Sequence, residues 1–167
     1  MTEIDKIIKK LQLKPHPEGG YFKEVYRSKG FINKRSLPSE FSGKRNYSTS
    51  IYFMLTSDDF SAFHRINQDE IWHFYKGSPI KLHLISDKGE YSNVIIGNNL
   101  EREETLQYIV FAKYWFAAEV INKNDYSLVG CTVSPGFDFN DFLLPKREQL
   151  VALFPKHKNI ITKLTSE

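Results

Sequence analysis

Short segments punctuated by turn residues are the feature that most constrains the fold of this chain. Each segment either alternates apolar with polar residues or is a brief continuous apolar run, which are the patterns of strands with one or both faces buried. The segments span residues 21–27, 47–55, 60–66, 70–75, 79–86, 91–96, 106–111, 115–120 and 126–134. No helical crossovers of the kind that a parallel α/β sheet needs separate them. The sequence therefore predicts an all-β sandwich or barrel.

Helical patterns are confined to the two ends of the chain. Thr2 precedes Ile4, Ile7, Ile8 and Leu11 at helical spacing, with Asp5 placed to complete a capping box, so we expect a helix packed outside the sheet. Beyond Pro145 the apolar spacing predicts a short helical tail, interrupted at Pro155. We therefore expect one domain over residues 1–167, with a helix at 1–13, a barrel at 20–144 and a tail at 145–167. The Ser- and Lys-rich stretch 31–43 is typical of a mobile excursion or flap.

Composition excludes several classes of function. The net charge is only +3, and the basic residues form no dense stripe, which argues against nucleic-acid binding. Cys131 is the sole cysteine, so no intrachain disulfide is possible; an inert buried thiol in a reducing compartment is expected. No segment approaches the ~18 apolar residues of a membrane span, and the charged N-terminal stretch lacks the apolar centre of a signal peptide. We expect a cytoplasmic protein without a membrane partner.

Candidate chemistry lies between residues 60 and 77. Strand alternation places Phe60, Ala62, His64 and Ile66 on one face, with Ser61, Phe63 and Arg65 on the other. After a polar turn, Glu70, Trp72 and Phe74 share a face, His73 takes the opposite one, and Gly77 closes the strand. If the first face of each strand points inward, His64 and Glu70 meet in an aromatic-lined cavity. His73 would lie outside it.

These residues carry a resemblance. The spacing from His64 to Glu70 to Gly77 resembles the first motif of the cupin superfamily. The segments at 16–20 (HPEGG), 50–53 (SIYF), 64–65, 69–74 (DEIWHF) and 134–137 (SPGF) are similar to signatures of a family of small cupins of unassigned function. The resemblance implies a jelly-roll barrel, a fold similar to that of sugar-nucleotide epimerases of the rhamnose pathway, and a homodimer.

The metal-binding members of that superfamily use three histidines and a glutamate, and this chain departs from that set. Ile66 stands at the second histidine position, while Phe111, Lys113 and Phe116 replace the proline, glycine and last histidine of the second motif. Two of four ligands remain, fewer than the three protein ligands that catalytic metals normally need. We expect neither a tightly held metal nor another cofactor, although His16 or His83 could supply a further ligand.

Two hypotheses of function follow for this cavity. The first is a binding module that holds a small molecule, such as a sugar, a nucleotide sugar or another carbonyl compound. The second is a metal-independent isomerase or epimerase with His64 as general base, Glu70 orienting it and Tyr52 as acid. A metal-dependent enzyme is the third and weakest hypothesis. If the cavity is functional, Trp72, Phe74 and Phe116 contact the ligand. In a purely structural interpretation, these three residues fill the core and His64 holds two strands together.

The segment around His16 and Glu18 also has two interpretations. Its glycines favour a loop with φ > 0 in which Glu18 caps backbone amides. Alternatively, the loop crosses the barrel mouth, and both side chains contact the ligand. Pro135, Gly136 and Phe137 are expected to turn the chain out of its last strand, with Phe137 and Phe139 packed beneath.

Overall fold

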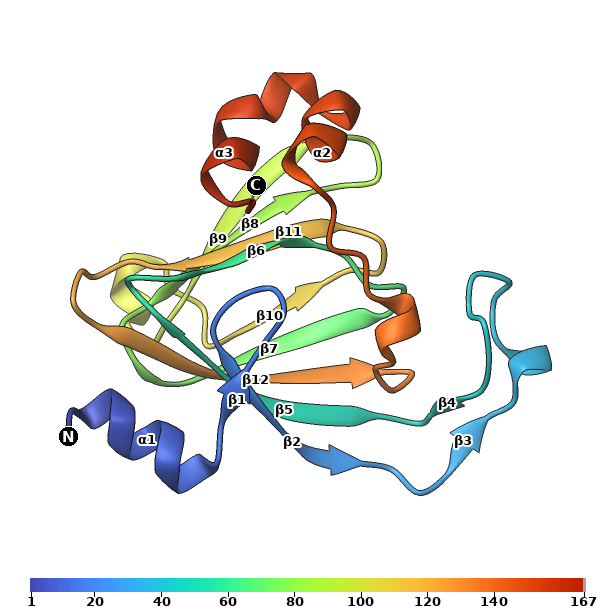
Figure 1. The fold of residues 1–167 in the computed structure, drawn as a ribbon, viewed down its shortest axis with the longest axis horizontal. Coiled ribbons are helices and arrows are strands. Elements are labelled where there is room, and N and C mark those ends of the chain that lie inside the picture. The colour runs from blue at the N-terminus through green and yellow to red at the C-terminus, as the bar shows by residue number, and fades with distance from the viewer. Residues whose placement is uncertain (167) are drawn as a thin grey trace.

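The computed structural model describes residues 1–166, and two antiparallel sheets form its body (Figure 1). The larger sheet has the order β1 (Lys14–Pro15), β2 (Tyr21–Arg27), β5 (Thr49–Thr56), β12 (Tyr126–Ser134), β7 (Asp69–Gly77) and β10 (Gln107–Val110). The smaller has the order β6 (Phe60–His64), β11 (Trp115–Val120), β8 (Ile80–Ile85) and β9 (Tyr91–Ile96). A separate pair, β3 (Phe31–Ile32) and β4 (Arg45–Asn46), projects from one end. The predicted all-β fold is confirmed.

The helices cover the outer faces of the two sheets. Helix α1 (Glu3–Leu11) begins with the expected capping box of Thr2 and Asp5, and its apolar side packs with Met54 on the outside of the larger sheet. Helices α2 (Arg147–Leu153) and α3 (Lys158–Lys163) are separated at Pro155 and cover the smaller sheet (Figure 1). No helix of the described chain is long and apolar enough to cross a membrane.

The main core lies between the two sheets. Trp72 and Phe53 from the larger sheet meet Phe116 and Leu82 from the smaller, and each is almost fully buried. At the end of β7, Gly77 has a φ of +97°, and a Cβ there would overlap the carbonyl oxygen of Tyr126. Only glycine fits that position without strain, so it closes the strand as expected.

One local expectation, regular alternation along β6, is wrong. The register between β6 and β11 shifts because of a bulge, so Ser61 opposes Ala118 while His64 opposes Phe116. The extra residue places Ser61 and His64 on the same inward face and turns Phe60 outward, against simple alternation. The stretch 31–43 is folded: β3 pairs with β4, a 3₁₀ helix spans Lys34–Ser36, and Phe41 is buried.

Candidate functional site

A cavity of about 340 Å³ opens at one end of the sandwich. Its walls come from the larger sheet, from the β1–β2 loop, from β6 and from the segment after β12. The lining residues are His16, Glu18, Phe22, Glu24, Arg27, Thr49, Ile51, Phe53, His64, Ile66, Glu70, Trp72, Cys131, Val133, Phe137, Asp138, Phe139 and Phe142. The structure thus brings together His64, Glu70, Trp72, His16 and Glu18, which the sequence singled out.

Three of the expected site residues lie elsewhere. Tyr52 points to the opposite face of β5 from the lining residues Ile51 and Phe53, where it packs near α1 and against Tyr75, so it cannot serve as an acid in the cavity. Phe74 and Phe116 are packed in the core and do not line the cavity. Alternation alone could not place Tyr52, because α1 makes the outer face of β5 apolar as well.

His64 is paired with Glu18, and the expected partnership with Glu70 is wrong. The Nε2 atom of His64 lies 3.0 Å from Oε2 of Glu18, and its Nδ1 lies 2.7 Å from the carbonyl oxygen of Ala62. A carbonyl oxygen only accepts, so Nδ1 carries a proton, and a neutral His64 ring presents a bare Nε2 to the carboxyl. Two lone pairs at that separation repel unless a proton lies between them. The pair therefore holds one shared proton.

Burial decides where that proton resides. Glu18 and His64 are both more than nine-tenths buried. Burial raises the pKa of Glu18 well above its ordinary value, and the nearby charge of Glu70 adds to the shift. Burial also lowers the pKa of His64 to about 3. Both shifts place the shared proton on the Glu18 carboxyl rather than on His64.

Ser61 completes this polar cluster. Its hydroxyl donates to Oε1 of Glu18 at 2.8 Å, and the backbone N–H of Ala62 donates to the carbonyl oxygen of Glu18 at 2.7 Å. Glu18 therefore anchors the loop to β6 through both its side chain and its backbone. The expected backbone-capping role for the Glu18 carboxyl is wrong, although Gly19 and Gly20 do have positive φ. Sequence alternation missed Ser61 because of the bulge.

Glu70 lies apart from this cluster on β7. Burial raises its pKa to about 7, while donation from the Cys131 thiol opposes the shift. The indole of Trp72 also favours the Glu70 carboxylate, although its buried Nε1–H has no hydrogen bond of good geometry. Burial raises the pKa of Cys131 well above its ordinary value, so this thiol is not a nucleophile at neutral pH.

Aromatic and charged side chains form the mouth of the cavity. The ring of Phe139 stacks on His16 at 6.1 Å, and Phe139 also contacts Phe137 and Phe142. Phe137 and Phe139 thus line the cavity rather than packing beneath the last strand as expected. Arg27 donates both to the Glu24 carboxylate and to the carbonyl oxygen of Phe137.

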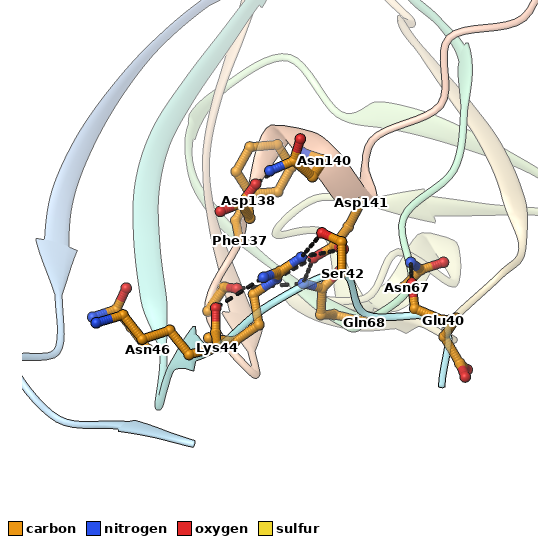
Figure 2. Close-up of polar contacts among 12 residues, drawn as sticks. Glu40, Ser42, Lys44, Asn46, Asn67, Gln68, Phe137, Asp138, Asn140 and Asp141 are labelled. Atoms are coloured by element: carbon orange, nitrogen blue, oxygen red, sulfur yellow. Dashed lines mark hydrogen bonds and ion pairs between the residues drawn. The ribbon is translucent and has the colours of Figure 1, made fainter. Parts of the chain in front are cut away.

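A buried ionic network fixes this mouth. Asp141, in the 3₁₀ helix η3 (Phe139–Asp141), accepts two hydrogen bonds of 2.7 Å from Arg45 on β4 and a third of 2.7 Å from Gln68. Figure 2 shows Asp141 and Gln68 meeting beside Ser42, with Phe137 and Asn140 on the adjoining segment. Gln68 also donates to the carbonyl oxygen of Gly136 at 3.3 Å. The network, hereafter the Arg45–Asp141 clamp, joins β4 to the aromatic segment 137–142.

The comparisons with known proteins identify the family. The model of the cupin superfamily family DUF985 matches residues 5–145. The chain belongs to this family. It is 30% identical to the uncharacterized Saccharomyces cerevisiae protein YML079W, and the match covers 88% of this chain and 77% of that protein. It is also similar to a hypothetical protein from Leishmania major (37% identity, 99% and 100% coverage, TM-score 0.88) and to protein SO0799 of Shewanella oneidensis (38% identity, 99% coverage of both chains, TM-score 0.88).

More distant cupins share only the fold. Oxalate decarboxylase of Bacillus subtilis is 18% identical with a TM-score of 0.54, and the match covers 90% of this chain but 36% of the decarboxylase. Membership of the family thus supports a small-molecule-binding cupin, and the cavity is the place where such a molecule would bind.

The cavity residues do not fit the metal set of metal-binding cupins. Two of its four positions hold Ile66, which lines the cavity, and Phe116, whose ring lies 4.1 Å from that of His64. The Nε2 atom of His64 faces the Glu18 carboxyl. Among residues 1–166, no group of three or more His, Cys, Asp or Glu side chains is arranged to hold an ion.

Proposed function

We propose that this protein binds a small, uncharged, oxygen-rich molecule, such as a sugar or another carbonyl compound. The observation that carries the proposal is a cavity of about 340 Å³ whose aromatic walls surround a few polar groups. This volume is at the small end for ligand pockets and suits a monosaccharide-sized molecule. Phe139 and Trp72 offer rings to the apolar faces of such a ligand.

Charge favours an uncharged ligand over a nucleotide sugar. The proton shared by Glu18 and His64 lies on Glu18, and burial lowers the pKa of His16 to about 4 and that of His64 to about 3, so neither histidine adds a positive charge near neutral pH. Glu70, with a pKa of about 7, can add a negative one. Arg27 is the cation that lines the cavity, and Glu24 engages it through both carboxylate oxygens. A diphosphate would meet acidic groups without a free cation to balance its charge.

The contacts of His64 argue against its role as a general base. One ring nitrogen faces the Ala62 carbonyl and the other the Glu18 carboxyl, which leaves no lone pair for a substrate proton. We assign His64 a positioning role instead, in which it holds the Glu18 proton inside the cavity wall.

Ligand binding is tested by native mass spectrometry of the gently purified protein and by Trp fluorescence titration against two matched panels. One panel contains neutral sugars and hydroxyketones, and the other contains their phosphates. We expect a co-purified or added neutral molecule to bind, the phosphates to bind at least ~10-fold more weakly, and Ile51→Phe, which fills the cavity, to abolish binding. His73→Gln is the control, because His73 contacts Gln107 and Thr132 and does not line the cavity. Tighter binding of the phosphates, or no binding from either panel, would contradict the proposal.

We also propose that the protein is a cytoplasmic homodimer. The short strand β1 pairs with Tyr21 and Phe22, and no other strand within residues 1–166 lies beside the rest of the β2 edge. Val25 and Tyr26 on that edge are about half exposed. An open strand edge with apolar side chains favours pairing of two subunits, and the free buried thiol of Cys131 suits a reducing compartment.

A further inference from the structure

His16 presents a hydrogen-bond donor that no group among the described residues uses. Its Nδ1 accepts the backbone N–H of Glu18 at 3.3 Å, so the proton of the neutral ring resides on Nε2. Burial lowers the pKa of His16 to about 4, which keeps the ring neutral under ordinary conditions. Within residues 1–166, Nε2 has no partner, although the ring lines the cavity.

Phenylalanine rings hold this imidazole in place. Phe22 contacts it edge-on at 4.6 Å, Phe142 at 5.8 Å and Phe53 at 6.2 Å, while Phe139 stacks on it. An apolar cage of this kind fixes the direction of the N–H and strengthens any hydrogen bond that it makes to a ligand.

Glu70 lines the same cavity as a potential proton acceptor. Cys131 and Trp72 favour its carboxylate form, and in the described part of the chain no basic side chain pairs with it. It is close enough to Glu18 for their charges to interact, and Oε2 of Glu18 lies 3.4 Å from Nδ1 of His16. A carboxylate and a neutral N–H donor therefore line one small cavity, and both lie near the Glu18 carboxyl.

We propose that the cavity catalyses proton exchange at the carbon next to a carbonyl group, with Glu70 as the base and the Nε2–H of His16 as the donor to the carbonyl oxygen. This inference rests on the proposed function, since it needs a carbonyl ligand in the cavity. Glu70 takes the proton from carbon, the C–H electron pair forms the C=C bond, and the carbonyl π pair moves to oxygen. The enolate formed accepts the His16 hydrogen bond. The Glu70 carboxyl exchanges this proton with water and returns a solvent proton to the same carbon, the C=C pair re-forms the C–H bond, and the oxygen lone pair re-forms the carbonyl, so the cycle closes as proton exchange without a redox partner.

A neutral imidazole suits this task. It donates to the developing oxyanion without the acidity of an imidazolium, which would protonate the base instead. General-base and oxyanion groups each typically contribute ~100-fold or more to such a step. The phenylalanine cage holds His16 in place before the ligand arrives, and the Cys131 thiol donates to Glu70.

The test uses hydroxyacetone and dihydroxyacetone as probes in deuterated buffer near neutral pH. Proton NMR follows deuterium incorporation beside the carbonyl, and saturation-transfer NMR on the same samples reports binding. We expect exchange above the buffer rate in the wild type and a loss of at least ~100-fold in Glu70→Gln and in His16→Phe, with probe binding retained in Glu70→Gln. His73→Gln should exchange at the wild-type rate. Circular dichroism checks folding, and His16→Gln replaces His16→Phe if the latter unfolds.

Each other outcome overturns a distinct statement. Wild-type binding of the probes without exchange overturns the proton-transfer inference and leaves the proposed ligand class standing. Exchange that survives in Glu70→Gln removes Glu70 as the base, and exchange that survives in both His16 variants removes His16 as the donor. Failure of the wild type to bind either probe contradicts the ligand class and the inference together.

Discussion

At the scale of single residues, the unusual feature of this protein is its set of buried ionisable groups whose pKa values are shifted in favour of their neutral forms. Glu18 and Glu70 have raised pKa values, and His16 and His64 have lowered ones. Each neutral group spares the cavity the cost of an unpaired buried charge. The same shifts make folding stability depend on pH, with opposite signs for the acids and the histidines.

The sign for each kind of group follows from which state binds more protons. Glu70 has an ordinary pKa of 4.5 and a folded pKa of about 7, so the folded state holds a proton that the unfolded chain releases, and the free energy of unfolding falls as pH rises across that window. Glu18, whose pKa is also raised by burial, acts in the same direction. His16 and His64 act oppositely, because the unfolded chain binds protons below about pH 6.5 that the folded state does not.

We therefore predict maximal stability between about pH 4.5 and 6.5, where these contributions offset each other, and a decline above it of up to ~1.4 kcal/mol per pH unit for each acid still titrating. Glu18→Gln keeps the shape of the side chain: the amide N–H can face Nε2 of His64, and the amide oxygen can accept from Ser61. This variant should lose less stability than the wild type as the pH rises above the ordinary carboxyl pKa of 4.5. Urea unfolding followed by Trp fluorescence measures both. Equal slopes for the two proteins would contradict the assignment of the proton to Glu18.

How far residues could be placed from sequence depended on strand regularity. His64, Glu70 and Trp72 were placed correctly in the cavity because one polar turn and regular alternation on β7 determine their directions. Ser61 was missed because the residue pattern of the five-residue strand β6 does not indicate the bulge. Glu18 was recognised, but its contact with His64 joins segments that are distant in sequence, and local pattern carries no information about such a pairing.

At the scale of elements, the Arg45–Asp141 clamp decides the shape of the cavity mouth. The Arg45 and Asp141 side chains are only 3% and 1% exposed. Breaking one partner of a buried ion pair leaves an uncompensated charge, which typically costs ~3–5 kcal/mol. The main energetic effect of the clamp is therefore the free-energy cost of leaving Arg45 or Asp141 unpaired, rather than the attraction between the two charges.

We predict that Asp141→Asn lowers the free energy of unfolding by roughly 3 kcal/mol and increases amide hydrogen exchange in residues 136–142. The matched control is Glu24→Gln, which breaks the half-exposed pair with Arg27 and should cost less than about 1 kcal/mol. Chemical denaturation and exchange mass spectrometry give the two readouts. Similar losses in the two variants would show that the clamp does not hold the mouth.

Element boundaries were predictable because strands here are short and turns are marked. Residues 21–27, 91–96, 115–120 and 126–134 coincide with β2, β9, β11 and β12. Strand β1 and the pair β3–β4 were missed, because a two-residue strand is too short to show a periodic pattern. The clamp was also unforeseen: nothing in the sequence around Arg45 indicates that its partner lies 96 positions away.

At the scale of the whole molecule, the open edge of β2 bears on assembly. We predict that light scattering gives twice the 19.5 kDa mass of one chain, and that Tyr26→Lys shifts the protein to the monomer by placing a charge on the edge. Leu100→Lys is the control, because Leu100 is also exposed but lies on the separate 3₁₀ helix η2 (Leu100–Arg102). A wild-type monomer, or equal dissociation of both variants, would contradict the dimer.

The bulge in β6 has a consequence for how this chain can vary. It places the Ser61 hydroxyl and the His64 ring on the same carboxyl, that of Glu18, which belongs to another segment. When any one of these three residues is replaced, a buried polar atom of the others loses its hydrogen-bond partner. Substitutions at positions 18, 61 and 64 are therefore tolerated most readily in concert, so that natural variants should inherit them as a set.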